Sequence, residues 1–183
     1  MSQLSIVLLQ LDIIFGNPEA NRQKVSEWFA KAKLQPNELV LLPELWDTGY
    51  DLTRLPEIAD QEGKTAQGFL SELAKKYQVF ISGGSIARQT GEKVFNTTYI
   101  VAPTGEIRTQ YDKVHLFRLM EEEKFLHAGK QLAQTTIADF LVAPLFVTTC
   151  VFQNGFVKVR TKGQNYCFFL RSGQRHGLSI GKN

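Results

Sequence analysis

The sequence predicts an α/β fold built on a mixed β-sheet. Short apolar runs of strand length alternate with amphipathic segments of helical period along residues 4–82, which is the order of an α/β protein. Residues 94–111 then contain two strand-like runs joined by a tight turn, which adds an antiparallel pair. With 183 residues, of which 43% are hydrophobic and 21% charged, the chain can bury the core of one domain.

The first part of the chain predicts a strand, a helix and a second strand. Leu4–Leu11 is an apolar run with β-branched residues, and an Asn-Pro-Glu helix-start signal precedes a helical pattern at Ala20–Lys33. Glu38–Leu42 is another apolar run, which ends at Pro43 because proline cannot donate to a ladder. Glu44 is therefore predicted just beyond a strand end.

The middle of the chain predicts a helix, a strand and a hairpin. Thr65–Lys76 carries apolar residues on one side, and a strand follows at Val79–Ser82. Val94–Val101 and Glu106–Tyr111 are joined by the turn Pro103-Thr104-Gly105 and are expected to pair as a hairpin. The predicted sheet is mixed because hairpin strands are antiparallel.

The last part of the chain differs in charge and in pattern. Residues 1–150 carry 15 basic and 18 acidic side chains, whereas residues 151–183 carry six basic and no acidic ones. From Leu141 onward the apolar residues follow neither period 2 nor period 3.6, so periodicity alone assigns no element there and residues 141–183 are expected to pack poorly.

Several classes of protein are excluded by composition. No apolar stretch reaches the roughly 18 residues that a membrane span needs, so a cytoplasmic protein without a membrane partner is expected. The only cysteines are Cys150 and Cys167, which lack the paired spacing of a metal site and are expected to be reduced. No metal or other cofactor is expected.

Charged residues that follow strands are candidates for chemistry. Glu44 and Lys113 both follow apolar strand-like runs, and in α/β sheets reactive groups project from loops at the carboxyl ends of strands. A carboxylate and an ammonium in that position can act as general base and oxyanion stabiliser. The ordinary alternatives are a solvated carboxylate, a surface lysine and, for Glu121–Glu123, a solvated charged face.

Three further side chains near these motifs have less specific readings. His115 is expected to be packed rather than to act as a base. Trp46 and Tyr50 fit the core and substrate contacts equally well.

Several short sequence motifs follow one another in a fixed order along residues 4–140. They are Leu42-Pro43-Glu44, Thr48-Gly49-Tyr50, Gly83-Gly84-Ser85, Phe95-Asn96-Thr97, Tyr111-Asp112-Lys113-Val114-His115-Leu116-Phe117 and Phe125–Gly129. In this order and wording they resemble the nitrilase superfamily of carbon–nitrogen hydrolases, and within it the ω-amidase-like branch. A set of co-linear motifs is far more specific than any single one.

The resemblance implies a four-layer α-β-β-α sandwich and a Glu-Lys-Cys triad that hydrolyses amides. Glu44 would be the general base and Lys113 would stabilise the tetrahedral intermediate. Glu122 would be the additional, substrate-orienting glutamate, with Glu121 or Glu123 as alternatives by a register slip. The implied substrates are small linear amides such as ω-amides of dicarboxylic acids, and the implied assembly is a homodimer.

The family's nucleophilic cysteine is missing from its expected place. It should lie at the end of the next apolar strand, which is Asp139–Leu145 here, and Val147 holds that place. Cys150 is the candidate substitute nucleophile, although three residues along an extended strand move a side chain about 10 Å and turn it to the other face.

A shift of reading frame restores the missing motif. Leu145–Val157 can be encoded by DNA whose shifted frame reads Ile-Cys-Tyr-Asp-Met-Arg-Phe-Pro-Glu-Trp-Phe-Arg, the family's nucleophile motif, when third bases are chosen freely. The same shift recovers a second family-like segment from Arg171–Gly177. We therefore expect residues 1–145 to be the N-terminal part of a carbon–nitrogen hydrolase domain, incomplete at the C-terminus, and residues 146–183 to be an aberrant basic tail. A genuine divergent tail is the alternative.

Three functions compete at this level. The first is a carbon–nitrogen hydrolase that is inactive in this truncated form, and the second is a catalytically dead fragment or pseudoenzyme. The third is a nucleic-acid-binding module that uses the basic tail and its interleaved aromatic residues. The tail contains no recognisable nucleic-acid-binding motif, so no nucleic-acid partner is expected.

Overall fold

The computed structural model describes residues 4–146, 155–161, 164–169 and 177–180, with side chains for residues 4–144 and Phe146. Strands and helices alternate along the chain up to residue 82, as predicted. The helices are α1 (Pro18–Lys31), α2 (Leu55–Ile58) and α3 (Lys64–Tyr77), with 3₁₀ turns η1 (Leu52–Arg54), η2 (Arg118–Met120) and η3 (Glu122–Lys124). The strands are β1 (Leu4–Leu8), β2 (Leu39–Leu41), β3 (Asp60–Gln61), β4 (Phe80–Ser82), β5 (Ile86–Thr90), β6 (Lys93–Val101), β7 (Ile107–Asp112), β8 (Thr135–Ile137), β9 (Phe140–Phe146), β10 (Gly155–Thr161), β11 (Gln164–Phe169) and β12 (Gly177–Ile180).

Helix α1 shows how local signals set an element. The Asn17 side chain accepts a hydrogen bond from the Ala20 amide at 3.1 Å, and Pro18 occupies the first helical position, where its missing N–H costs nothing. Val25 and Phe29, four residues apart, point into the core. The predicted helix is confirmed, although it begins two residues earlier than predicted.

The larger sheet is mixed, as the hairpin predicted. Its strand order is β12-β1-β2-β4-β6-β5-β3, with β7 also paired to β6. Strands β1, β2 and β4 are parallel, whereas β6 is antiparallel to β4, β5 and β7. Strands β2, β4 and β7 therefore run in one direction, and their carboxyl ends share one edge of the sheet.

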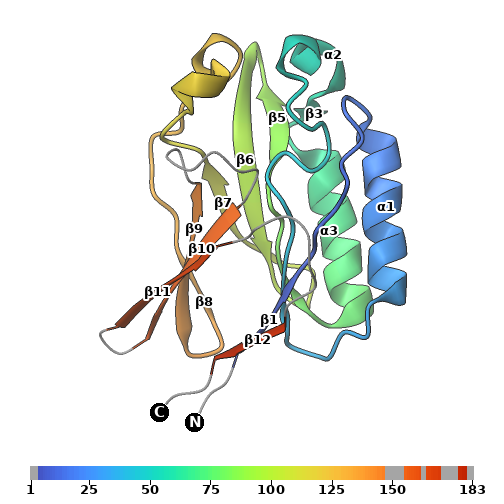
Figure 1. Ribbon diagram of the computed structural model, residues 1–183, viewed down its shortest axis with the longest axis vertical. Coiled ribbons are helices and arrows are strands. Elements are labelled where there is room, and N and C mark those ends of the chain that lie inside the picture. Colours follow the sequence, from blue (N-terminus) through green and yellow to red (C-terminus); the bar gives the residue numbers. More distant parts are fainter. Residues whose placement is uncertain (1–3, 147–154, 162–163, 170–176, 181–183) are drawn as a thin grey trace.

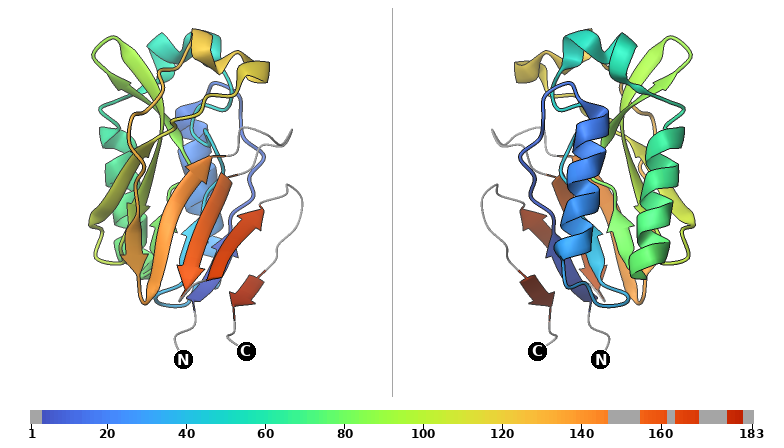
Figure 2. Two further views of the ribbon diagram at one scale, coloured as in Figure 1. Left: turned by 90° about the vertical axis from the view of Figure 1, so that its left-hand side faces the viewer. Right: turned by 90° about the vertical axis from the view of Figure 1, so that its right-hand side faces the viewer.

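The molecule is layered as helix, sheet and sheet. Helices α1 and α3 cover one face of the larger sheet, and the four-stranded sheet β11-β10-β9-β8 covers the other face (Figures 1 and 2). Alternate residues of β1 and β2 point to opposite sides, so Leu39 and Leu41 pack between the sheets while Val40 packs under the helices. The described residues thus form three layers of the predicted four-layer sandwich.

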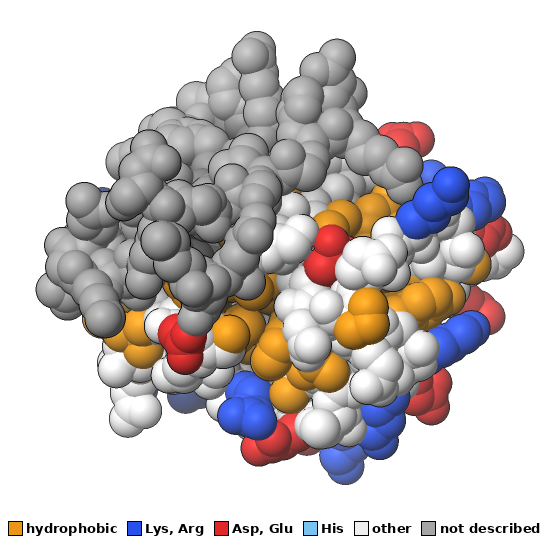
Figure 3. Space-filling view, turned by 90° about the horizontal axis from the view of Figure 1, so that it is seen from below, with side chains coloured by type: hydrophobic (Ala, Val, Ile, Leu, Met, Phe, Trp, Pro, Cys, Tyr) orange, Lys and Arg blue, Asp and Glu red, His pale blue; other side chains and the backbone are white. Residues whose placement is uncertain are grey.

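Basic and acidic side chains are mixed on the described part of the face seen from below. Lys and Arg side chains lie among Asp and Glu side chains over the described part of that face (Figure 3).

No described helix is long and apolar enough to cross a membrane. In the last part of the chain, the expected apolar strand Asp139–Leu145 is present as β9, and the backbone forms β10, β11 and β12 where the sequence pattern assigned no element. Val142 and Pro144 are buried, so the prediction of poor packing is wrong for these two residues, while the side chains of residues 147–183 lie outside the described ones.

Candidate active site

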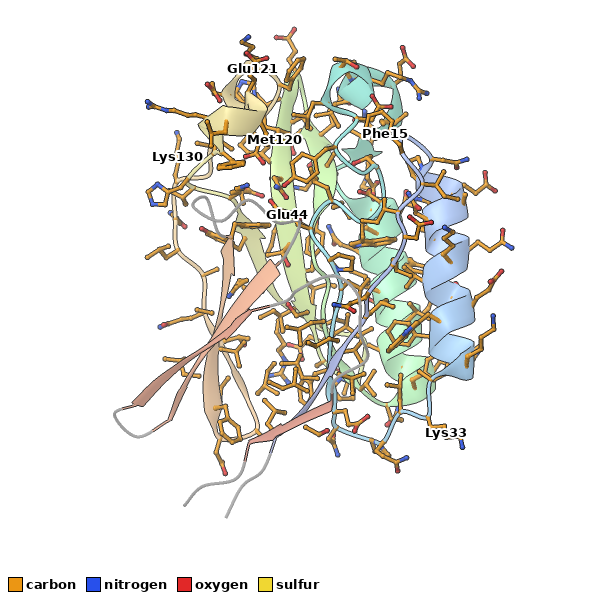
Figure 4. All side chains as sticks on the ribbon, in the orientation of Figure 1. Phe15, Lys33, Glu44, Met120, Glu121 and Lys130 are labelled. Atoms are coloured by element: carbon orange, nitrogen blue, oxygen red, sulfur yellow. The ribbon has the colours of Figure 1, made fainter. Side chains whose placement is uncertain are left out.

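Lys113 lies at the centre of a buried cluster of charges. Its Nζ atom is 2.9 Å from Glu44 Oε1 and 2.9 Å from Glu122 Oε1. The exposed fractions are 1% for Lys113, 5% for Glu44 and 0% for Glu122. The two side chains that follow strand-like runs, Glu44 and Lys113, thus lie in contact, and Figure 4 shows Glu44 in the interior of the molecule.

The backbone of Lys113 is held on both sides. Its amide donates to the Asn96 carbonyl on β6 at 2.8 Å, and its carbonyl accepts from the Gly129 amide at 2.8 Å. A Cβ atom at position 129 would lie 2.2 Å from the Asp112 carbonyl oxygen, so only glycine allows this approach. The strand end that carries the lysine is therefore fixed between two segments.

Glu44 is positioned by the turn that follows β4. Gly84 has a φ of +56°, and a Cβ there would lie 1.9 Å from the Pro43 carbonyl oxygen. The same carbonyl accepts from the Ser85 amide at 3.1 Å, which ties the residue before Glu44 to this turn. Trp46 is fully buried, and its indole N–H donates to the Gly83 carbonyl at 2.9 Å, so it belongs to the core.

Only the middle one of the three consecutive glutamates faces the site. Glu122 Oε2 accepts from the Phe117 amide at 2.7 Å while its Oε1 faces Lys113. Glu121 and Glu123 are exposed, and Figure 4 shows Glu121 at the outer end of the molecule. The interpretation as a solvated charged face is therefore wrong for Glu122 and correct for its two neighbours.

Burial raises the pKa of Glu44, and the charge of Glu122 raises it further, although Lys113 and a hydrogen bond from Asn96 oppose the rise. Burial also raises the pKa of Tyr50. The carboxylates of Glu44 and Glu122 raise this pKa further, both by their negative charge and by accepting hydrogen bonds from the hydroxyl. Tyr50 is therefore a neutral donor that faces both carboxylates. The sequence alone fits both a core position and a substrate contact for Tyr50.

Arg88 braces the strand end from the other side. Its Nη2 atom lies 3.1 and 2.9 Å from the two carboxylate oxygens of Asp112, the residue before Lys113, and its Nε donates to Thr97 Oγ1 at 3.1 Å. The guanidinium also lies 5.1 Å from the centre of the Phe95 ring. No sequence signal singled out Arg88, because its partners Phe95 and Thr97 come from β6 and its partner Asp112 comes from β7.

Replacing Arg88 by methionine should lower the free energy of unfolding by about 2–3 kcal/mol, because the half-buried Asp112 carboxylate loses its charged partner. Urea unfolding at neutral pH would measure the loss. Arg108→Met is the matched control, since the Arg108 pair with Glu106 is exposed and should contribute about 0.5 kcal/mol or less. Equal losses in the two variants would contradict the bracing role.

Three further residues named from the sequence are His115 and the two candidate nucleophile positions, Val147 and Cys150. His115 is exposed, so the expectation of a packed histidine is wrong; the chain leaves the sheet after Lys113 and turns this side chain to solvent. Val147 and Cys150, which bear on the nucleophile, lie outside the described residues. The side chains that the structure describes contain no group of three or more His, Cys, Asp or Glu that could hold a metal ion.

The end of β9 reaches the charged cluster. The Phe146 ring centre lies 5.5 Å from Lys113 Nζ, and the ring stacks on Tyr111 at 5.7 Å between centroids. The residue after Phe146 is Val147, the place where the sequence resemblance expects a cysteine.

Comparison with known proteins gives concordant matches. A family model described as carbon-nitrogen hydrolase matches residues 5–183. The 2-oxoglutaramate amidase of Bacillus subtilis (strain 168) is 38% identical over 164 residues, which cover 90% of this chain and 63% of that protein. The human omega-amidase NIT2 is 30% identical over 136 residues, which cover 70% of this chain and 49% of that protein.

A solved structure matches as well. It is XC1258 from Xanthomonas campestris, described as a CN-hydrolase superfamily protein with an arsenic adduct in its active site. The TM-score is 0.72 at 26% identity, over 79% of this chain and 53% of that one. The chain thus spans between about half and two thirds of the length of these relatives.

Proposed function

We propose, because this chain belongs to the carbon–nitrogen hydrolase family, that Glu44, Lys113 and Glu122 are the acid–base and electrostatic part of an amidase site. One observation carries the proposal: a buried ammonium lies 2.9 Å from each of two buried carboxylates at the carboxyl edge of the sheet. Buried charges are costly, and clusters of this kind occur preferentially at functional sites.

The proposed reaction assigns one task to each group. A cysteine thiolate attacks the amide carbon, and Glu44 takes the thiol proton and returns it to the leaving amine. The raised pKa of Glu44 favours this exchange, because a base is most effective when its pKa approaches the working pH. Lys113 meets the negative charge on the carbonyl oxygen, and Glu122 fixes Lys113 and orients the substrate.

The proposed substrates are small linear amides, in particular ω-amides of dicarboxylic acids. The Bacillus and human relatives are a 2-oxoglutaramate amidase and an omega-amidase, which supports this class. Because the chain lacks a cysteine at position 147, we also propose that it is inactive in this form. The frame-restored form, which carries the shifted-frame sequence after residue 145, is the proposed active protein.

Ammonia release from short ω-amides tests the function. We expect no release above background from the chain as it stands or from its Cys150→Ala variant, and release from the frame-restored form. A Glu44→Gln change in the restored form should lower kcat at least about 100-fold, because it removes the general base. Activity of the chain as it stands that disappears in Cys150→Ala would instead identify Cys150 as the nucleophile.

A further inference from the structure

Asn96 keeps an unpaired polar atom beside the proposed general base. Among the side chains that the structure describes, its Oδ1 is the buried polar atom without a hydrogen-bond partner, and the residue is 0% exposed. Its Nδ2 atom donates to Glu44 Oε1 at 2.8 Å. A buried carbonyl oxygen without a donor costs about 1–3 kcal/mol, so proteins almost always supply a donor from the chain or from water.

The geometry fits a donor shared with Glu44. The two polar atoms of a carboxamide are about 2.3 Å apart, given standard C=O and C–N bond lengths. Asn96 Oδ1 therefore lies at most about 5 Å from Glu44 Oε1. A water molecule that donates to two acceptors at ordinary distances spans up to about 5.5 Å. The separation of the two oxygens therefore lies within the span of one bridging water.

We propose that Asn96 Oδ1 and the Glu44 carboxylate together bind one water molecule, and that this water hydrolyses the acyl-enzyme. The inference rests on the proposed function. In that step the water oxygen bonds to the acyl carbon and the thioester C–S bond breaks. The water's proton passes to Glu44 and then to the departing thiolate. Because both acceptors take hydrogen bonds from the water, its lone pair is free to attack, and Asn96 is a positioning residue.

The water site can be tested in the chain as it stands. A water-selective rotating-frame Overhauser experiment on ¹⁵N-labelled protein should give a cross-peak between long-lived water and the Asn96 carboxamide protons. Asn21 is the matched control: it is 1% exposed, its Oδ1 accepts from the Ile14 amide, and its Nδ2 donates to the Ile14 and Asp47 carbonyls. No cross-peak is expected for Asn21.

Repeating the measurement in Tyr50→Phe and in Lys113→Met removes the relay of the water signal through the two exchangeable groups beside Glu44, the Tyr50 hydroxyl and the Lys113 ammonium. A cross-peak at Asn96 that persists in both variants supports the site. If Asn96 shows no cross-peak, or loses it in either variant, the inference is overturned.

The catalytic part is tested by competition between water and hydroxylamine for the acyl-enzyme. In the frame-restored form, Asn96→Ser should lower the ratio of hydrolysis to hydroxamate formation roughly tenfold, because only the water loses its positioning group. If Asn96 merely orients Glu44, both products fall and the ratio stays unchanged, which overturns the proposal. A restored form that releases no ammonia would remove the proposed function and this catalytic role, while the Overhauser result would still decide the water site.

Discussion

Replacing Lys113 by methionine is expected to lower the free energy of unfolding by about 3–5 kcal/mol at neutral pH. Methionine has a similar length and no charge, so it leaves the Glu44 and Glu122 carboxylates buried without their shared cation. Removing one partner of a buried ion pair costs far more than the pair contributes, because the remaining charge keeps its desolvation penalty. Two carboxylates are left here, and they repel each other.

Urea unfolding of the two proteins would measure this loss. Lys33→Met is a matched control, because Lys33 is exposed at the periphery of the molecule (Figure 4) and should change stability by about 0.5 kcal/mol or less. In the double variant Glu44→Gln, Glu122→Gln, the Lys113→Met change should lower the free energy of unfolding by less, since no buried carboxylate then remains beside position 113. A loss below about 1 kcal/mol in the native background would show that water reaches and screens these carboxylates.

Residues with strong local signals made much of the fold predictable. Pro43 ends one strand by its chemistry, and the Asn-Pro-Glu signal caps α1 as expected. Strand β1 is shorter than predicted because its parallel partner β2 supplies only Leu39–Leu41, so pairing ends although the apolar run continues. Strand β5 was missed because its polar Arg88 and Gln89 do not follow a strand pattern, and its pairing with β6 creates it.

The candidate site was predictable only in part. Glu44 and Lys113 follow strands, so topology alone brings them to one edge, whereas only the family resemblance singled out Glu122. Asn96 and Tyr50 come from a central strand and a loop, and only the packed fold reveals that they face Glu44. The nucleophile, the out-of-frame tail and the homodimer remain predictions.

Another buried carboxylate, Asp47, lies in the segment that links Glu44 to Tyr50. It is 2% exposed, and its Oδ1 accepts from the Thr48 amide at 2.8 Å. Burial raises the pKa of Asp47 to about 7, and the charge of Asp60 also raises it, although hydrogen bonds from the backbone of Thr48, Asp47 and Ala87 oppose the rise. No cation pairs with Asp47 among the residues that the structure describes.

The raised pKa links stability to pH. Below pH 3.8, the ordinary pKa of this group, Asp47 is protonated in both the folded and the unfolded chain, so its contribution to stability is fully present. Between pH 3.8 and about 7 the unfolded chain releases this proton first, and the free energy of unfolding falls as pH rises. Above about pH 7 both states are ionised and the full penalty remains.

Asp47→Asn should therefore stabilise the protein at neutral and higher pH, because the neutral carboxamide keeps an acceptor for the Thr48 amide and carries no buried charge. The stability difference between the variant and the native chain should grow as pH rises from 4 to 8, by at most about 4 kcal/mol. Urea unfolding across that range would measure it. Asp12→Asn is the control, because Asp12 is fully exposed and its contact with Lys24 should contribute little at any pH. A constant difference across the range would mean that Asp47 titrates at its ordinary pKa, and that its backbone hydrogen bonds offset its burial.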